Sequence, residues 1–247
     1  TRQNDANKLL PTKGNPTFEG PVRQFGNKTE QQFKFNFNKH QEGIASAPQM
    51  FERAKRLNPE FQKQVAKVAD DLGVDQGFNP VGGKVTEVKL MPRMIEKVNQ
   101  KYNGDFSQIT DPIRTRIVVE TPQQEKLIAE RIAKLFPTVD GERVLMKKSG
   151  YLDRKLNVQF TGANGENIIG EIGIITRPML DGAHEAHDIY EAFRKTNFGL
   201  PDGTDVRKIA EEGLRLEKRM KDIFEPKGRL IDPRFYEDII ERFNKGG

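Results

Sequence analysis

The chain of 247 residues contains no cysteine. A disulfide scaffold, a thiolate metal site and a cysteine nucleophile are therefore excluded, and the composition is typical of a reducing compartment. No apolar run approaches the roughly 20 residues that a transmembrane helix needs. The N-terminus also has no apolar core of a signal peptide. We therefore expect a cytoplasmic site of action and no membrane partner.

Several catalytic signatures are missing too. The sequence has no Walker-type phosphate loop, no Rossmann fingerprint, no kinase signature and no serine in a nucleophile elbow. Hydrophobic residues make up 35% of the chain and the mean hydropathy is -0.73, so a substantial polar fraction is expected outside the core. The net charge of +5 suits a polyanion such as a nucleotide or nucleic acid, although an ordinary basic surface has the same balance.

The polar composition divides the chain into three parts. Residues 1–47 are rich in Asn, Gln, Lys, Gly and Pro, which predicts an extended arm or linker. Within it, residues 33–38 alternate between apolar and polar side chains, as in a half-buried strand. This strand would either extend the edge of the domain's sheet or dock on another chain. Residues 48–199 are expected to form the main domain, and 200–247 a helical extension.

Hydrophobic periodicity predicts alternating helices and strands. Two amphipathic helices are expected within 48–72, divided at Asn58-Pro59, and two more at 204–224 and 233–243. Between them, strands are predicted at 84–90, 113–120 and 142–147, helices at 91–102, 122–135 and 180–195, and a hairpin at 152–160 and 167–175 with an Asn-Gly turn. We therefore expect an α+β fold with a mixed, mostly antiparallel sheet of about five strands, flanked by helices.

One carboxylate stands out within the hairpin. Glu171 lies in an otherwise apolar run, where an ionised acid is costly unless it is paired, hydrogen-bonded or bound to a metal. Strand alternation places Glu171 and Gly173 on one face, and the glycine leaves room for a ligand. A second acid, Asp111, opens the strand 113–120. If the two strands are neighbours, their acids converge, as Mg²⁺-dependent phosphoryl chemistry requires.

Cations accompany both acids. Lys89, Arg93 and Lys97 are spaced four apart, which aligns them on one helix face. An anionic ligand would explain this row, although a solvated face shows the same pattern. Arg114 and Arg116 share one face of the strand that follows Asp111.

The first hairpin strand has one polar face, which is either plain solvent exposure or part of a site. Its odd positions are Tyr151, Asp153, Lys155, Asn157 and Gln159. Lys147 lies just before it in a glycine-containing loop, from which a lysine can reach phosphates, and a tyrosine ring can stack on a base. Farther along, His184 and His187 lie three apart, but no third ligand accompanies them, so a structural or substrate-contacting role is favoured over metal binding.

In their order and spacing these motifs resemble the synthetase domain of the RelA/SpoT family, the nucleotide 3′-pyrophosphokinases that make alarmones. The resemblance runs from about residue 48 to 195. The segments that carry it are Lys89, Arg93 and Lys97, then Asp111-Pro112-Ile113-Arg114-Thr115-Arg116, Lys147, Gly150-Tyr151, Glu171-Ile172-Gly173-Ile174, and His187-Asp188-Ile189-Tyr190.

The resemblance implies a role for each matching position. Asp111 and Glu171 would bind Mg²⁺, and Glu171 would also activate the attacking hydroxyl. Tyr151 would stack on the acceptor base and Lys147 would contact phosphates. The ATP site would be formed by Lys89, Arg93, Lys97 and Arg116, with Arg114, Lys155 and His187 as further substrate contacts.

This chain departs from the family pattern at several positions. Asp153 and Lys155 stand where the family motif ends in histidine, Arg114 replaces an apolar residue, and Gly173 replaces a glutamine. The serine usual between the two ATP-site lysines is Arg93, and the arginine expected two residues before Lys89 is Glu87. The pattern is closest to the divergent members found in secreted toxins and in phage or mobile-element polyproteins.

The function implied is Mg²⁺-dependent transfer of pyrophosphate from ATP to a nucleotide 3′-hydroxyl, giving (p)ppGpp or (p)ppApp. The protein would act as a toxin or effector, delivered by secretion or by a phage and restrained by a cognate inhibitor. The alternatives are pyrophosphorylation of the 3′ end of tRNA and a catalytically inactive nucleotide-binding or structural module of a larger polyprotein.

Overall fold

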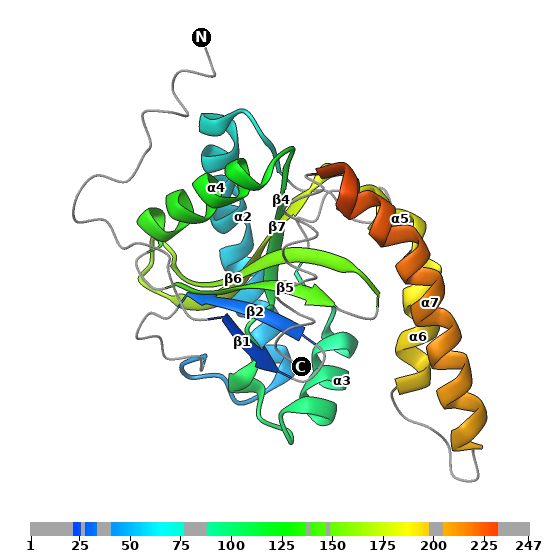
Figure 1. Cartoon of the computed structure of the whole chain (residues 1–247). Helices are drawn as coiled ribbons and strands as arrows, with labels where there is room; N and C mark the ends of the chain where they lie inside the picture. Colours follow the sequence, from blue (N-terminus) through cyan, green and yellow to red (C-terminus); the bar gives the residue numbers. More distant parts are fainter. Residues whose placement is uncertain are drawn as a thin grey trace.

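The computed structural model describes residues 22–25, 28–33, 41–76, 88–136, 139–146, 149–197 and 205–231 (Figure 1). Its centre is a mixed seven-stranded sheet with the strand order β1-β2-β5-β6-β7-β4-β3. The four long strands are β4 (Ile113–Val119), β5 (Val139–Met146), β6 (Tyr151–Thr161) and β7 (Asn167–Thr176). Shorter strands extend both edges: β1 (Val22–Phe25) and β2 (Lys28–Phe33) beside β5, and β3 (Asp75–Gln76) beside β4.

Every neighbouring pair of strands is antiparallel except β4 and β7, which run parallel. The predicted α+β fold with a mixed, mostly antiparallel sheet is therefore confirmed. The expected count of about five strands is wrong, because the four long strands are joined by three short edge strands that local periodicity does not reveal. The parallel pair aligns Ile113 with Gly170 and Arg114 with Glu171. Glycine is needed at 170, because a Cβ there would lie 2.7 Å from Cγ1 of Ile113.

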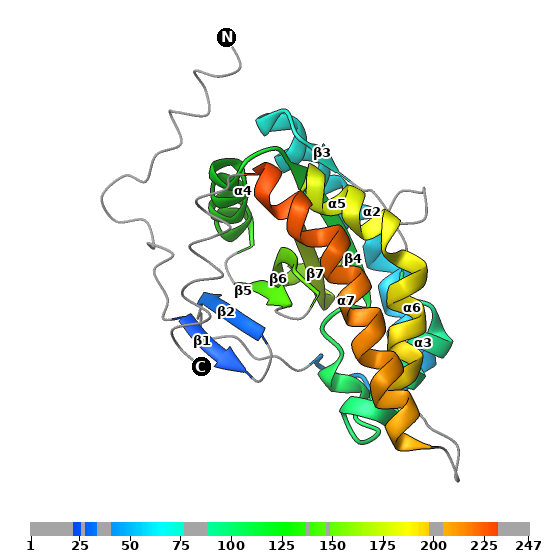
Figure 2. The same cartoon turned by 45° about the vertical axis from the view of Figure 1, so that its right-hand side comes forward.

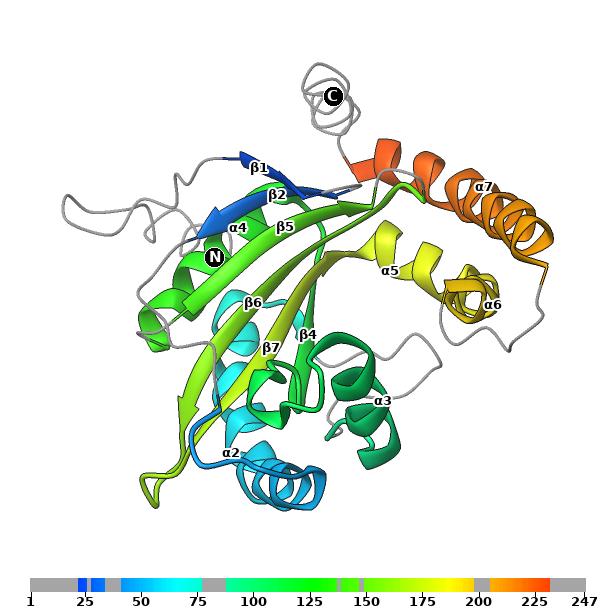
Figure 3. The same cartoon turned by 90° about the horizontal axis from the view of Figure 1, so that it is seen from below.

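Two helices cover one face of the sheet: α2 (Ala47–Leu72) and α4 (Pro122–Leu135) (Figures 1 and 3). The main core lies between them and the sheet, with the ring centroids of Phe61 and Phe160 5.7 Å apart. Arg154 interrupts the apolar face of β6, and its charge is matched by Glu125 of α4, with Nε and Oε1 2.6 Å apart. This pairing explains a charged residue on the core face.

Three helices lie by the opposite face: α5 (Arg177–Glu185), α6 (His187–Asn197) and α7 (Val206–Ile231) (Figure 2). A second cluster of buried residues joins them to the sheet, including Val118, Ile175, Met179, Met220 and Phe224. The helix α3 (Met91–Lys101) and the short 3-10 helix η1 (Phe106–Gln108) precede β4. None of the helices in the described ranges combines the length and the apolar composition that a membrane-spanning segment requires.

The division of 48–72 into two helices is wrong, because α2 is continuous and Pro59 lies inside it. The apolar stripes on both sides of the proline are buried in the same core, as Leu57 and Phe61 show, so a break would separate side chains that pack together. The helix ends where predicted, at Gly73, whose φ of 65° suits a left-handed cap.

Other predicted bounds also change. The expected helix 180–195 is two helices, α5 and α6, which meet at the buried Ala186. Helix α7 extends to Ile231, beyond the predicted 204–224, and the predicted helix 233–243 lies outside the described residues. Residues 88–90 form no strand; instead the Lys89 N–H donates a single hydrogen bond to the Pro112 carbonyl. The rest of the predicted strand 84–90 lies outside the described ranges.

Within the expected N-terminal arm, β1 and β2 add two strands to the sheet beside β5. Of the predicted strand 33–38, only Phe33 is described, as the last residue of β2. The division of the chain into an arm, a domain and a helical extension stays a prediction.

Candidate active site

A cavity of about 370 Å³ lies between the sheet and helices α5, α6 and α7. It is lined by six of the residues that the sequence singled out: Arg114, Arg116, Tyr151, Lys155, Glu171 and His187. They come from β4, β6, β7 and α6, so the fold gathers side chains that are up to 73 residues apart in the chain, from 114 to 187.

Strand register explains how this face forms. Glu171 is aligned with Asn157 on β6 and with Arg114 on β4, so it lies in the middle of three strands. Lys155 is aligned with Gly173. A Cβ on Gly173 would come no closer than 3.8 Å to any neighbouring atom, so the glycine keeps the surface beside Glu171 open.

Lys155 is held as a cation. Glu171, and then Asp153, raise the pKa of its ammonium group, although burial opposes them. Burial raises the pKa of Asp153, whose Oδ2 accepts a hydrogen bond of 2.8 Å from the Tyr151 hydroxyl. Burial, and then Asp153, raise the pKa of Tyr151, which therefore keeps its proton. The floor of the cavity thus combines a fixed positive charge with oriented polar groups.

Two buried atoms at this site have no hydrogen-bond partner within the described part of the chain: Nη1 of Arg116 and Oδ1 of Asp153. Buried polar atoms are nearly always hydrogen-bonded in native proteins. Arg116 and Asp153, which both line the cavity, thus each keep one buried polar atom whose hydrogen-bonding capacity is unused among the described residues.

Asp111 lies beside this cavity and forms a second charged group. Its side chain is 11% exposed, and its Oδ2 and Oδ1 are 2.6 Å and 2.8 Å from Nζ of Lys89 and Lys97. Burial opposes ionisation of Asp111, but the two lysines outweigh it and lower its pKa. The pKa of Lys89 is lowered, because the effect of burial exceeds the opposing effect of the Asp111 carboxylate.

The two charged groups influence each other. The pKa of Lys97 is raised overall. Burial acts to lower it, but this is outweighed by Asp111 and, more weakly, by Glu171. Asp111 likewise contributes to the raised pKa of Lys155. The parallel pairing of β4 with β7 makes the two strands neighbours, and the acids Asp111 and Glu171 both raise the pKa values of Lys97 and Lys155.

The predicted row of three cations separates in the structure. Lys89 and Lys97 bind Asp111, whereas Arg93 pairs with Glu96 at 2.8 Å and with Glu191 of α6 at 3.5 Å. Because Arg93 contacts Glu191, and Glu191 lines the cavity, Arg93 lies near the rim of the cavity. Lys147, another predicted phosphate contact, lies outside the described residues.

Sequence reasoning missed the wall that α7 contributes. Met220 and Phe224 line the cavity, and the Phe224 ring packs edge-on against Tyr151 with centroids 5.3 Å apart. Their spacing of four predicts a buried stripe on an amphipathic helix but does not say what that stripe contacts. Alternation along β6 predicts that Asp153 lies on its polar face, but no motif in the sequence indicates that it lines the cavity.

The donor set limits how a metal ion would bind. Among the described residues, no group of three or more His, Cys, Asp and Glu side chains is placed to hold one. Mg²⁺ often binds through only one or two carboxylates, with substrate phosphates completing its shell. Glu171 lines the cavity and has a carboxylate of this kind, whereas both oxygens of Asp111 accept from lysines, so joint binding of Mg²⁺ by the two acids stays a prediction.

No family model matches the chain, and no curated protein matches it. Solved structures do. Small alarmone synthetase 1 from Bacillus subtilis matches with a TM-score of 0.53 and 17% identity, over 80% of this chain and 97% of that chain. This chain has the alarmone-synthetase fold. The family resemblance of its motifs is thereby confirmed at the level of the fold.

Two further matches have lower TM-scores. A GTP pyrophosphokinase family protein from Streptococcus pneumoniae has a TM-score of 0.45 and 16% identity, covering 73% of this chain and 95% of that chain. The type VI effector Tas1, in complex with its immunity protein, has a TM-score of 0.44 and 19% identity, covering 71% of this chain and 96% of that chain.

In this alarmone-synthetase fold, the polar cavity lies over β4, β6 and β7.

Proposed function

We propose that this chain transfers the pyrophosphate group of ATP to the 3′-hydroxyl of a nucleotide, as in the synthesis of (p)ppGpp or (p)ppApp. The observation that carries the proposal is the position of Glu171. It is a carboxylate in a cavity with Arg114, Arg116 and Lys155, on a sheet with the alarmone-synthetase fold. The cations suit phosphates, and the carboxylate suits a hydroxyl that must lose its proton.

The reaction needs one bond to form and one to break. The acceptor's 3′-oxygen bonds to the β-phosphorus of ATP, and the bond between that phosphorus and the oxygen bridging to the α-phosphate breaks. AMP leaves with the bridging oxygen, and the hydroxyl proton passes to Glu171. Because phosphoryl transfer depends mainly on positioning and charge stabilisation, fixed cations around the phosphates supply much of what it requires.

The lysines and arginines divide between two binding regions. Lys89, Lys97 and Arg116 would hold the ATP phosphates, with Arg114 beside the aligned Glu171 and Arg93 at the rim. On the other side, Tyr151, Lys155 and His187 would hold the acceptor. The Tyr151 ring lies against Phe224, so an acceptor base would enter a space bounded by both aromatic rings.

Mg²⁺, when bound, would neutralise phosphate charge and align the triphosphate. Glu171 and Asp111 would hold it. Both oxygens of Asp111 accept from lysines in this structure. For Asp111 to bind the ion, one ammonium group must exchange its carboxylate oxygen for a phosphate oxygen, which bound ATP would provide.

The test uses Glu171→Gln, which keeps the shape and removes the proton acceptor. General-base catalysis is typically worth about 10²- to 10⁴-fold, so turnover should fall by that order while calorimetry still detects ATP binding. Glu166→Gln, at the tip of the same hairpin, is the matched control and should keep its turnover. Turnover of Glu171→Gln close to the wild-type rate would remove this residue from the reaction.

Two rivals have different products. With the 3′ end of tRNA as acceptor, the label from ATP would appear in RNA. Cations on α7 would favour an RNA acceptor, but three of them, Arg207, Arg215 and Lys221, each pair with a glutamate of the same helix and so offer less free charge to RNA. A catalytically inactive module would bind ATP in calorimetry and form no product with any acceptor.

A further inference from the structure

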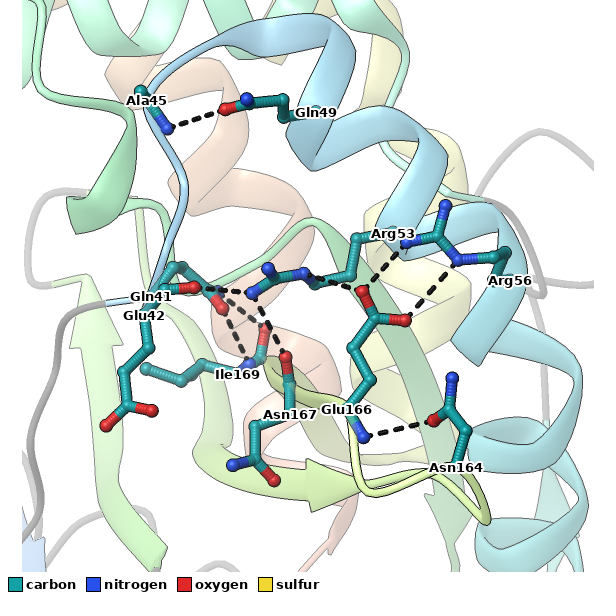
Figure 4. A network of polar contacts seen from close by, with 10 residues as sticks. All are labelled: Gln41, Glu42, Ala45, Gln49, Arg53, Arg56, Asn164, Glu166, Asn167 and Ile169. Carbon is teal, nitrogen blue, oxygen red and sulfur yellow. Dashed lines mark hydrogen bonds and ion pairs between the residues drawn. The ribbon is translucent and has the colours of Figure 1, made fainter.

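Gln41 is a polar residue buried just before α2, with an exposed fraction of 3%. Its side-chain amide is fully engaged with the backbone of two distant segments. Nε2 donates to the carbonyl oxygens of Ile109 at 2.7 Å and Ile169 at 3.0 Å, and Oε1 accepts from the Ile169 N–H at 2.9 Å. The Gln41 N–H also donates to the Ser107 carbonyl at 2.7 Å. Figure 4 shows the side chain directed at Ile169.

The two segments are those that carry the acids of the candidate site. Ile109 precedes Asp111 by two residues, and Ile169 precedes Glu171 by two. The ladder between β4 and β7 begins only at Ile113 and Gly170. The side-chain amide of Gln41 therefore links these two segments before their strand pairing starts. Its hydrogen bonds to Ile109 and Ile169 connect them where no backbone hydrogen bonds between β4 and β7 are formed.

We propose that Gln41 is a positioning residue that sets the placement of Asp111 relative to Glu171. This inference rests on the proposed function, in which both acids serve one reaction. Ile169 lies two residues before Glu171 in the extended strand β7, about 7 Å along the chain, and Ile109 lies two residues before Asp111 in the segment that leads into β4, so a shift of either anchor moves the backbone next to its acid. Displacing a reacting group by about 1 Å can lower turnover by as much as 100-fold.

Other contacts in the same region hold the hairpin but not the acids. Glu166, at the hairpin tip, accepts from Arg53 at 3.1 Å and from Arg56 at 2.8 Å (Figure 4). Arg53 also donates to the carbonyl oxygens of Glu42, at 2.6 Å, and Asn167. These bonds join α2 to the hairpin on the same side of the molecule as Gln41 and provide a matched comparison.

The experiment compares Gln41→Met with Glu166→Gln in the ATP transfer assay. Methionine keeps the length of glutamine and removes all three side-chain hydrogen bonds. We expect kcat to fall on the order of 10- to 100-fold, with KM for ATP nearly unchanged, because the loss concerns alignment and not binding. Glu166→Gln should keep kcat within about twofold, since partly exposed ion pairs contribute little. Circular dichroism at the assay temperature confirms that each variant is folded.

The outcomes separate the possibilities. Gln41→Met with wild-type kcat overturns the positioning role, and so does an equal loss in Glu166→Gln, which would trace the effect to general loosening. If Gln41→Met does not fold, Gln41→Asn keeps the amide but is one methylene shorter, and the same loss of kcat is expected. A wild-type protein that forms no product overturns the proposed function, whereas an active wild type with an unaffected Gln41→Met overturns the positioning role alone.

Discussion

Replacing Asp111 with asparagine should destabilise the protein markedly. The carboxylate lies between the ammonium groups of Lys89 and Lys97, at 2.6 Å and 2.8 Å, and the three side chains are only 11% to 21% exposed. Asparagine keeps the shape but removes the negative charge, so two nearly buried cations face each other without compensation. A lost partner of a buried ion pair typically costs about 3–5 kcal/mol.

We take the lower end of that range, about 3 kcal/mol, because the site retains some contact with solvent. For a domain of about 150–250 residues, each kcal/mol lowers Tm by roughly 2–4 °C, so the expected drop is about 6–12 °C. Asp71→Asn is the control. Asp71 pairs with Arg131 at 3.6 Å with both side chains more than 40% exposed, and such surface pairs contribute about 0–1 kcal/mol.

The measurement is urea unfolding followed by circular dichroism at pH 7. Equal free energies of unfolding for Asp111→Asn and Asp71→Asn would show that the Asp111 carboxylate does not stabilise the two lysines. A pH series adds a second check, because the folded protein holds the pKa of Asp111 below its value in the unfolded chain. Stability from a depressed carboxyl pKa is complete above the unfolded value, about 3.9, and is lost as the pH falls through the folded value. The difference between wild type and Asp111→Asn should thus be constant from about pH 7 to 5 and shrink below about pH 4.

Three further predictions concern the cavity and the core. Phe224→Ala should raise KM for the acceptor severalfold with little change in KM for ATP, because the Phe224 ring packs on Tyr151. If steady-state kinetics give the variant the same acceptor KM as the wild type, α7 does not contribute to the acceptor site. Gly173→Ala should fold normally, because a Cβ there comes no closer than 3.8 Å to the atoms around it, yet the added methyl group should weaken nucleotide binding in calorimetry. Undiminished affinity would place the ligand elsewhere. Arg154→Met should lower the free energy of unfolding in urea by about 3–5 kcal/mol, because it leaves the buried Glu125 carboxylate without its partner. Adding Glu125→Leu should recover most of that stability. A double variant as unstable as the single one would contradict the buried pairing.

The sequence predicted the parts of the site that depend on local periodicity. Alternation along β6 and β7 places Lys155, Glu171 and Gly173 on one face, and the register of the two strands bears this out. The same local pattern failed at Pro59, where a break was expected. There, burial of Leu57 and Phe61 in one core outweighs the cost of a proline inside a helix.

The rest of the site depends on contacts between distant segments. Gln41 lies in a polar stretch without periodicity, and its partners are 68 and 128 residues away, so no local pattern indicates its burial. The Phe224 stripe was recognisable as buried, but only the packing of α7 against Tyr151 shows which surface it covers. The pairing of Asp111 with two lysines likewise depends on a contact between distant segments, in which Lys89, just before α3, and Lys97, within it, meet the residues that precede β4.

The most direct test of the account is the identity of the product. The purified protein is incubated with ATP labelled in the β-phosphate, Mg²⁺ and a panel of nucleotide acceptors, and the products are resolved by mass. Pyrophosphate transfer would give an acceptor heavier by one intact pyrophosphate group, with one AMP released for each acceptor modified. ADP with a singly phosphorylated acceptor, or ATP consumption without any modified acceptor, would contradict it.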